Sequence, residues 1–176
     1  VLYDMFLVKY DPSGNVLWAK GAGNAGDQRG VNTSTDASGN VFVTGYYKSS
    51  MTFGTITLTN AGGIDMFIAK YDSSGNVPWA NRGAGSGYDD VKSVAVDASG
   101  NVIATGSFDG PSTTFGTTTL TNANTVFSDI FVVKYDPSGN VLWAKKQDAG
   151  GNYFDVATSV AADAFGAVFD RDLAGH

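Results

Sequence analysis

The sequence lacks several residue types on which common active sites and scaffolds depend. It contains no cysteine, which excludes a disulfide framework, cysteine-ligated zinc and a thiol nucleophile. Its one histidine is His176, the last residue, so histidine-based triads and multi-histidine metal sites are excluded too. Only 11 lysine and arginine residues stand against 17 acidic ones, whereas a nucleic-acid binder needs a basic face. No apolar run reaches the about 18 residues of a membrane span, so we expect no membrane insertion.

Glutamate is also absent, and all 17 acidic residues are therefore aspartate. Glutamate favours helices, whereas aspartate favours turns. Together with 23 glycines, this composition predicts strands joined by tight turns. The chain begins at Val1 inside a strand-like pattern, which leaves a removed signal peptide or a piece of a longer protein as explanations.

Two interleaved motifs repeat along the chain. The first reads DMFLVKYDPSGNVLWAK in its first copy, and the second reads TDASGNVFVTG. Copies of the first motif begin at Asp4, Asp65 and Asp129, and copies of the second end at Gly45, Gly106 and Asp172. Both centre on a D-x-S-G-N turn, in which aspartate caps the turn and glycine takes a left-handed conformation. Each motif is therefore predicted to be a β-hairpin.

The flanking strands are apolar on both faces, which is typical of sheets covered on both sides by neighbouring blades. We assign four strands to each repeat, exemplified by Val94–Asp97, Val102–Thr105, Asp65–Tyr71 and Val77–Ala80. Pro78 fits an outer edge strand, where a missing N–H is tolerated. The alternating stretches Phe53–Asn60 and Phe115–Asn122 are either extra strands or strand extensions. The predicted fold is all-β: a β-propeller of four-stranded antiparallel blades.

We expect one propeller-repeat domain, 1–176, with about three blades' worth of strands. Its parts are strands three and four of a split blade (1–20), two full blades (31–80 and 91–144), and strands one and two of a split blade (156–172). Propellers typically have about 4–8 blades. A homodimer with a six-bladed ring, or the rest of a longer propeller, is therefore expected to close the ring.

The combined pattern D-x-F-x-x-K-Y-D-x-S-G-N-V-x-W-A and V-x-D-A-S-G-N-V-x-x-T-G resembles the bacterial SBBP β-propeller repeat, with NHL repeats as a looser relative. The resemblance covers nearly the whole chain. It implies a blade of a secreted or cell-surface bacterial protein, commonly without an assigned activity. The last copy departs from the pattern at Asp170-Arg171-Asp172, which leaves its strand pair and the role of Asp170–His176 open.

Two sets of charged residues have alternative interpretations. Intact D-x-S-G-N turns begin at Asp11, Asp36, Asp72, Asp97 and Asp136. They could ligate calcium, but self-capping explains every residue, so we expect no metal and no cofactor. Lys9, Lys70 and Lys134 share one repeat position. They could line a channel that holds an anion; our favoured interpretation is local pairing with aspartate at the blade end.

Ligand contacts are expected on variable stretches and on the polar loops between blades. Tyr47, Tyr88, Asp89 and Asp90 are the candidate ligand-binding residues. The tryptophans share one repeat position beside alanine, which favours packing between blades over sugar stacking. Turns account for most aspartates, so we assign no catalytic residue and expect no enzyme.

The function predicted is a non-catalytic scaffold or interaction module. The alternatives are a repeat-based glycan-binding propeller with one weak site in each blade, and a propeller glycoside hydrolase. Near-identical motifs favour the scaffold, because an active site normally breaks repeat symmetry. The expected partners are a second copy or the rest of a longer propeller, with a glycan or a protein as possible ligand.

Overall fold

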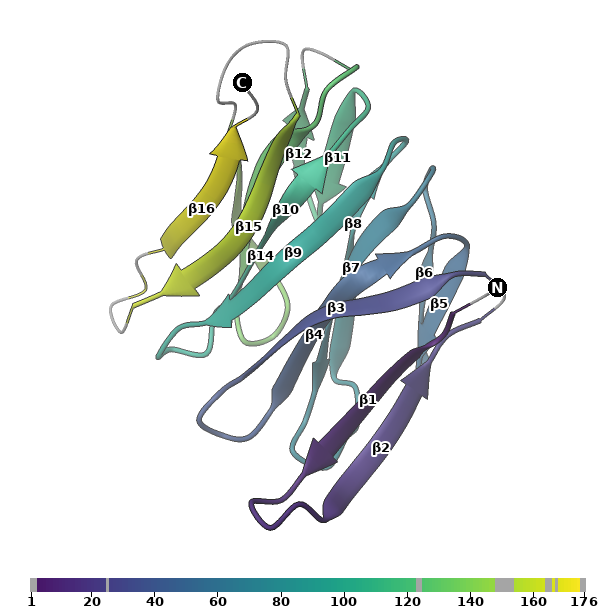
Figure 1. Ribbon diagram of the computed structural model, residues 1–176, viewed down its shortest axis with the longest axis vertical. Helices are drawn as coiled ribbons and strands as arrows, with labels where there is room; N and C mark the ends of the chain where they lie inside the picture. Colours follow the sequence, from purple (N-terminus) through teal and green to yellow (C-terminus); the bar gives the residue numbers. More distant parts are fainter. Residues whose placement is uncertain are drawn as a thin grey trace.

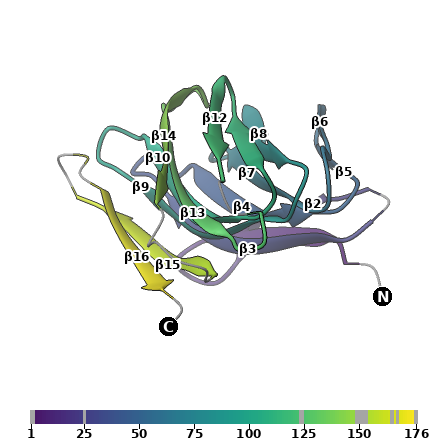
Figure 2. The same cartoon turned by 90° about the horizontal axis from the view of Figure 1, so that it is seen from above.

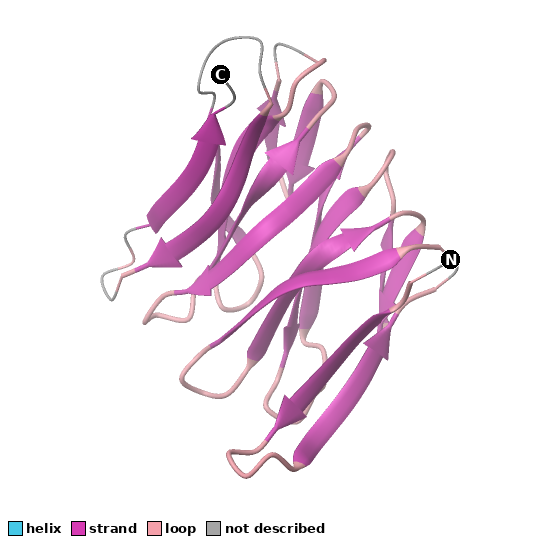
Figure 3. Cartoon of the chain, in the orientation of Figure 1, coloured by secondary structure: helices cyan, strands magenta, loops and turns pink. Residues whose placement is uncertain are grey.

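The computed structural model describes residues 3–24, 26–122, 125–147, 154–163 and 166, and the backbone of 168–174. Within these residues the chain forms sixteen strands and no helix (Figure 1, Figure 3). The predicted all-β propeller architecture is confirmed. None of the described segments is a helix of the length and apolarity needed to cross a membrane.

Two full antiparallel blades occupy the middle of the chain. The first has the strand order β3 (Gln28–Thr35), β4 (Val41–Tyr47), β7 (Asp65–Tyr71) and β8 (Trp79–Gly85). The second has the order β9 (Asp89–Val96), β10 (Val102–Phe108), β13 (Asp129–Tyr135) and β14 (Val141–Gln147). In both blades strand two pairs with strand three in the same register.

A half-blade lies at each end of the chain. One consists of β1 (Met5–Tyr10) and β2 (Val16–Ala22), which correspond to strands three and four. The other consists of β15 (Asp155–Ala162) and β16 (Val168–Ala174), which correspond to strands one and two. The first strands β3, β9 and β15 lie side by side in Figure 1, and the sheets fan out from them in the view of Figure 2.

The degenerate last repeat forms a regular hairpin in spite of its sequence. Its register shifts between Ala157 and Ser159, as that of β3 and β4 shifts between Gly30 and Asn32. The Gly166 N–H donates to the Asp163 carbonyl at 3.1 Å, as the corresponding glycine does in every intact turn. Backbone geometry of the repeat thus survives where the side chains diverge, while residues 175–176 lie outside the described part of the chain.

The alternating stretch between strands two and three is a hairpin rather than a single strand. It consists of β5 (Ser50–Phe53) and β6 (Ile56–Thr59) in the first blade, and of β11 (Ser112–Phe115) and β12 (Thr118–Thr121) in the second. β11 pairs with β8, the outer strand of the preceding blade. A bridge between Gly23 and Thr52 places β5 beside β2 in the same way. Each inserted hairpin therefore links its own blade to the one before it.

Pro78 does not lie inside an edge strand, so this prediction was wrong. β8 begins one residue later, at Trp79, and its pairing with β11 covers Gly83 to Gly85. Proline without an N–H is accommodated here by the late start of the strand.

The glycine that ends the second motif is required because the backbones of strands one and two approach each other closely at this position. A Cβ on Gly45 would lie 1.9 Å from the Arg29 carbonyl oxygen, and one on Gly106 would lie 1.9 Å from that of Asp90. No side chain fits at such a distance. Glycine is required because strand one bulges toward strand two at this point.

Tryptophan side chains on the fourth strands pack against the next blade. The Trp18 ring stacks on Tyr71 with the centroids 5.8 Å apart, and Trp79 stacks on Tyr135 at 6.1 Å. These stacks, together with the buried rings between sheets, cover the strands on both faces. The predicted packing of these tryptophans between blades is therefore confirmed for Trp18 and Trp79.

Candidate functional site

The D-x-S-G-N turns use both oxygens of their aspartate. In the turn of Asp72, Oδ1 accepts the N–H groups of Ser74 and Asn76 at 2.9 Å, and Oδ2 accepts the Asn76 side-chain amide at 2.8 Å. The other four intact turns repeat these bonds. The asparagine side chain, followed by backbone N–H groups, lowers the pKa of Asp72 below its ordinary value. Groups aimed at these oxygens are donors, which a cation would have to displace, and no cluster of three potential metal-ligating side chains occurs in the described part of the chain.

The equivalent lysines contact turns rather than the aspartates of their own strands. The Lys134 ammonium lies 2.9 Å from Asp97 Oδ2, and it donates to the Gly166 carbonyl at 3.1 Å. Lys9 donates to the Gly39 carbonyl at 2.7 Å, in the turn of the next blade. The expected pairing with aspartate thus holds for Lys134, through a turn aspartate. It was wrong for Lys9 and Lys70, because both donate to turn carbonyl groups, Lys70 to that of Pro137 at 3.1 Å. A groove of about 410 Å³ at this end is lined by one lysine and two turn aspartates, which is a poor anion site.

Exposed aromatic rings and an arginine gather at the opposite end, where β3 and β9 begin. The guanidinium carbon of Arg29 lies 4.2 Å from the ring centroid of Tyr3 and 6.0 Å from that of Tyr46. The rings of Tyr46 and Tyr88 are 6.4 Å apart. Tyr3 and Tyr88 are 47% and 44% exposed. We call these four residues the Tyr–Arg patch.

The patch forms because strand pairing places its members together. Arg29 on β3 is directly opposite Tyr46 on β4, and Asp27 anchors the guanidinium through an ion pair of 3.3 Å. In the second blade the corresponding pair is Asp90 opposite Ser107. The patch is therefore a departure from the repeat. A comparison of the copies position by position was the signal that could have identified Arg29 and Tyr46 from the sequence.

The four candidate ligand-binding residues have different environments. Tyr88 is exposed and belongs to the patch. Tyr47 is buried, donates its hydroxyl to the Thr59 carbonyl at 3.2 Å, and packs against Phe67. Asp90 pairs with Lys92, and Asp89 is fully buried. Only Tyr88 thus offers a large accessible surface to a ligand.

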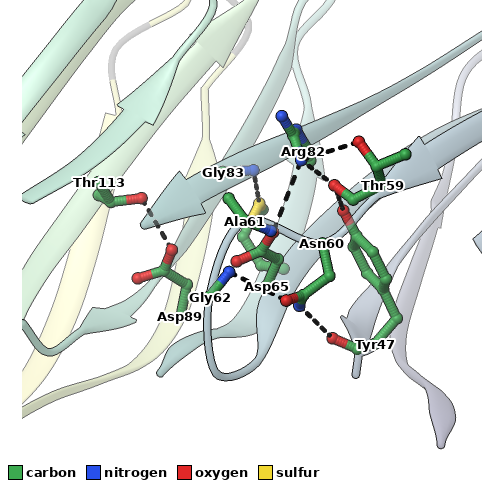
Figure 4. A network of polar contacts seen from close by, with 11 residues as sticks. Tyr47, Thr59, Asn60, Ala61, Gly62, Asp65, Arg82, Gly83, Asp89 and Thr113 are labelled. Carbon is green, nitrogen blue, oxygen red and sulfur yellow. Dashed lines mark hydrogen bonds and ion pairs between the residues drawn. The ribbon is translucent and has the colours of Figure 1, made fainter. Parts of the chain in front are cut away.

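Behind the patch, Asp65 and Asp89 form a buried pair of carboxyl groups between the two full blades (Figure 4). Thr113 donates to Asp89 Oδ2 at 3.0 Å, and the Ala61 N–H donates to Asp65 Oδ2 at 2.7 Å. Arg82 lies 3.9 Å from the same Asp65 oxygen. The Oδ1 atom of each carboxyl group is buried without a hydrogen-bond partner.

Burial raises the pKa of Asp89 to about 7, and the nearby Asp65 charge adds to this effect. Burial also raises the pKa of Asp65, against the opposing effects of the Ala61 N–H and Arg82. Below about pH 7, the pair therefore holds a proton on Asp89. A glycosidase needs two carboxyl groups that flank a bound sugar. Because neither group is exposed, this pair has the chemistry of an interface between blades, not of a substrate site.

The equivalent position in the first blade carries an amide. Gln28 is buried. With the side-chain amide assigned in the orientation that satisfies its neighbours, its nitrogen donates to Asp4 Oδ1 at 3.0 Å and to the Tyr3 carbonyl at 3.2 Å. Asp4 and Asp65 occupy the same repeat position, as do Gln28 and Asp89. The first interface between blades thus joins an amide to a carboxylate, and the second joins two carboxyl groups.

No family model matches the chain. Its sequence is 33% identical, over 192 aligned positions, to an uncharacterized WD repeat-containing protein of Acanthamoeba polyphaga mimivirus. The alignment covers 91% of this chain but 14% of that protein, so the chain spans a small part of the relative's length. WD repeats form four-stranded propeller blades. The similarity therefore supports a WD-like propeller repeat in general, rather than the SBBP repeat specifically.

Proposed function

We propose that this protein is a non-catalytic β-propeller scaffold that binds a protein partner through the Tyr–Arg patch. The observation that carries the proposal is the patch itself, with two exposed tyrosines and an arginine held against aromatic rings. Tyrosine and arginine are enriched at the points of protein interfaces that contribute most to affinity. The rings offer large contact areas with little rotamer entropy to lose.

A protein ligand is favoured over a glycan by the asymmetry of the patch. A repeat-based lectin would have an equivalent site in each blade, whereas Arg29 and Tyr46 are replaced by Asp90 and Ser107 in the next one. WD repeat propellers generally bind protein partners and are typically non-enzymatic, and the similarity to a WD repeat protein supports the same role here.

A selection from a phage-displayed random peptide library on the immobilised protein tests the proposal. We expect enriched peptides whose binding weakens by about tenfold or more in Arg29→Ala and Tyr88→Ala, as at other interface hot spots. Phe154→Ala is the matched control, because Phe154 is an exposed aromatic residue outside the patch. Peptides that bind both patch variants as tightly as the wild type would contradict the proposal. Binding of glycans at several equivalent weak sites, or hydrolysis of any member of a glycan panel, would contradict it as well.

Two further parts of the proposal concern the location of the protein and the completion of its ring. The SBBP resemblance supports a secreted or cell-surface location in a bacterium, which fractionation of expressing cells would test. The two half-blades support completion of the ring by a second copy.

A further inference from the structure

We propose that a pocket between β2 and the first full blade binds a carboxylate group, with which the Lys20 ammonium pairs and to which the Tyr71 hydroxyl donates a hydrogen bond. The inference goes beyond the proposed scaffold function. The pocket lies at the turn end of the molecule and shares no residue with the Tyr–Arg patch. It adds a binding site of a different chemical class, at a place where the copies of the repeat differ.

The pocket has a volume of about 360 Å³. Its walls come from the end of β2, the tip of the β5–β6 hairpin and the turn that follows β7. This volume lies at the lower end of the range of about 300–1,000 Å³ that is usual for small-molecule sites. It therefore suits a ligand about the size of one sugar or one amino-acid residue.

The pocket opens because Pro78 shortens the pairing of β7 with β8. In the other two copies of this hairpin, the ladder pair nearest the turn joins tyrosine to valine. In the β7–β8 hairpin the ladder stops one pair earlier, so Tyr71 and Val77 are not paired. Proline supplies no N–H and restricts the conformation of the residue before it, which explains the late start of the strand.

The position of the valine decides whether the space is filled. In the second full blade, a Cβ on Gly116 would lie 3.1 Å from Cγ2 of Val141, so the valine covers the tip of the inserted hairpin. A Cβ on the equivalent Gly54 would meet nothing within 4 Å. The space that a valine fills at one blade interface is therefore open at the other.

The last part of β2 supplies a cation without a partner. Lys20 and Asn81 have the same position on the fourth strand of their blades. The Asn81 amide donates to the Gly139 carbonyl at 2.6 Å. The Lys20 side chain instead crosses the turn, with its Cε 2.8 Å from where a Cβ on Gly75 would be. Its ammonium forms neither a hydrogen bond nor an ion pair with any residue that the structure describes.

The Tyr71 hydroxyl is a second donor without a partner. Tyr71 is 2% exposed, and it lines the pocket with the part that remains accessible. The buried hydroxyl of Tyr47 donates to the Thr59 carbonyl, whereas that of Tyr71 has no partner among the described residues. The hydroxyl of Tyr135, its equivalent, also lacks a partner but is sealed from solvent. Because a buried donor without a partner is costly, an accessible one at a pocket indicates a ligand.

These donors favour an acceptor with a single negative charge. The ammonium of Lys20 supplies one positive charge, and the hydroxyls of Tyr71 and Thr55 add donors without charge. A carboxylate matches this set, with one charge and two oxygens that accept strong charge-assisted hydrogen bonds. A phosphate with about two charges would leave one of them uncompensated in a chain of net charge -6. An acidic sugar and the C-terminus of a peptide both present this group.

Titration with small carboxylates, followed by heteronuclear NMR of the backbone amides, tests the proposal. The probes are D-glucuronate and N-acetylalanine, each with its neutral counterpart, D-glucose and N-acetylalanine amide. We expect at least one carboxylate to shift the amide signals of Gly21, Gly54 and Gly75 saturably, at the millimolar concentrations usual for ligands of this size. The amides of Gly116 and Gly139, at the equivalent positions of the second interface, are the internal control and should not shift.

The two carboxylates distinguish the sources of the ligand. A response to glucuronate alone would support an acidic sugar, and a response to N-acetylalanine alone would support a peptide C-terminus. No response to either carboxylate would overturn the proposal. Equal shifts with the neutral counterparts, or equal shifts at both sets of glycines, would also overturn it.

Two substitutions remove one donor each and keep the packing. Lys20→Gln keeps a stem across the turn, and Tyr71→Phe keeps the ring that stacks on Trp18. Each should raise the dissociation constant of the responding carboxylate, Lys20→Gln by about tenfold, as the loss of a hydrogen bond to a charged group does. Lys145→Gln and Tyr135→Phe are the matched controls from the equivalent positions, and they should leave the constant unchanged. Unchanged binding by both pocket variants would overturn the proposal.

Pro78→Leu tests the origin of the pocket. Leucine stands at this position in the other two copies of the hairpin, as Leu17 and Leu142. The variant should extend the ladder to Val77, close the pocket and abolish the response to carboxylates. Its melting temperature should be no lower than that of the wild type, which shows that the loss of binding is not unfolding. Full carboxylate binding by Pro78→Leu would overturn the assignment of the site to this break in the repeat.

Discussion

Replacing Asp89 by asparagine should make the protein more stable at alkaline pH, although the substitution changes a buried side chain. Asp89 is fully buried, with Oδ1 lacking a hydrogen-bond partner and Asp65 beside it. An amide has nearly the same shape, accepts the Thr113 hydroxyl with its oxygen, and carries no charge. The first blade already places an amide at this position, where Gln28 donates to Asp4.

The magnitude follows from the pKa of Asp89, which burial raises from 3.8 to about 7. A folded-state pKa above the unfolded one means that the folded protein holds the proton more tightly. The stabilisation is therefore fully present below about pH 4 and is lost as the pH rises through about 7. At about 1.4 kcal/mol for each pH unit, the whole effect is at most about 4 kcal/mol. About 3 kcal/mol of it should disappear between about pH 5 and about pH 8.

Urea unfolding followed by tryptophan fluorescence, repeated across this pH range, measures the effect. We expect the free energy of unfolding of Asp89→Asn, minus that of the wild type, to grow by about 3 kcal/mol from the acid to the alkaline end. Asp90→Asn is the matched control, because Asp90 is the next residue of β9 and its carboxylate pairs with Lys92 outside the buried carboxyl pair. This variant should not show the growing difference from the wild type. A difference that stays flat for Asp89→Asn would refute the buried, proton-holding carboxyl pair.

Three other substitutions test the framework. Asp97→Ala should cost about 2 kcal/mol in urea unfolding, because it removes the acceptor of two turn N–H groups and the partner of Lys134. Gly45→Ala should cost about 3 kcal/mol or more, since its Cβ would collide with a backbone carbonyl, and a melting temperature unchanged from wild type would contradict the close approach. Trp79→Ala should cost about 3–5 kcal/mol, measured by thermal unfolding, through loss of its stack on Tyr135.

The features that could be predicted from the sequence are those that local chemistry determines. A D-x-S-G-N turn needs each of its residues for a bond within five positions, so its hairpin can be recognised without knowledge of the rest of the fold. Apolar residues on both faces of the strands indicated sheets that are covered on both sides. The burial of nearly every residue of β7 and β13 shows this coverage. Four strands in each repeat followed from the spacing of the two motifs.

The features that could not be predicted depend on how blades sit against each other. The burial of Tyr47 requires the inserted hairpin that supplies the Thr59 carbonyl. The partner of Lys9 belongs to the following blade, and the pairing of β11 with β8 crosses from one repeat to the next. No local pattern encodes these contacts, because they are set by the angle between sheets.

The two ends of the molecule differ in how freely their side chains can change. At the turn end, the contacts come from aspartate and asparagine side chains, so a substitution breaks them. At the opposite end, the first residue of strand one is held by its backbone N–H, which any residue except proline supplies. These bonds join Gln28 to Tyr3, Asp89 to Ile64 and Asp155 to Ser128 at 2.8, 2.8 and 3.1 Å. The exposed positions beside these residues, such as Arg29 and Tyr88, can therefore differ between copies at little cost to the fold. This is a physical reason for the Tyr–Arg patch to lie there and for the search for a partner to start there.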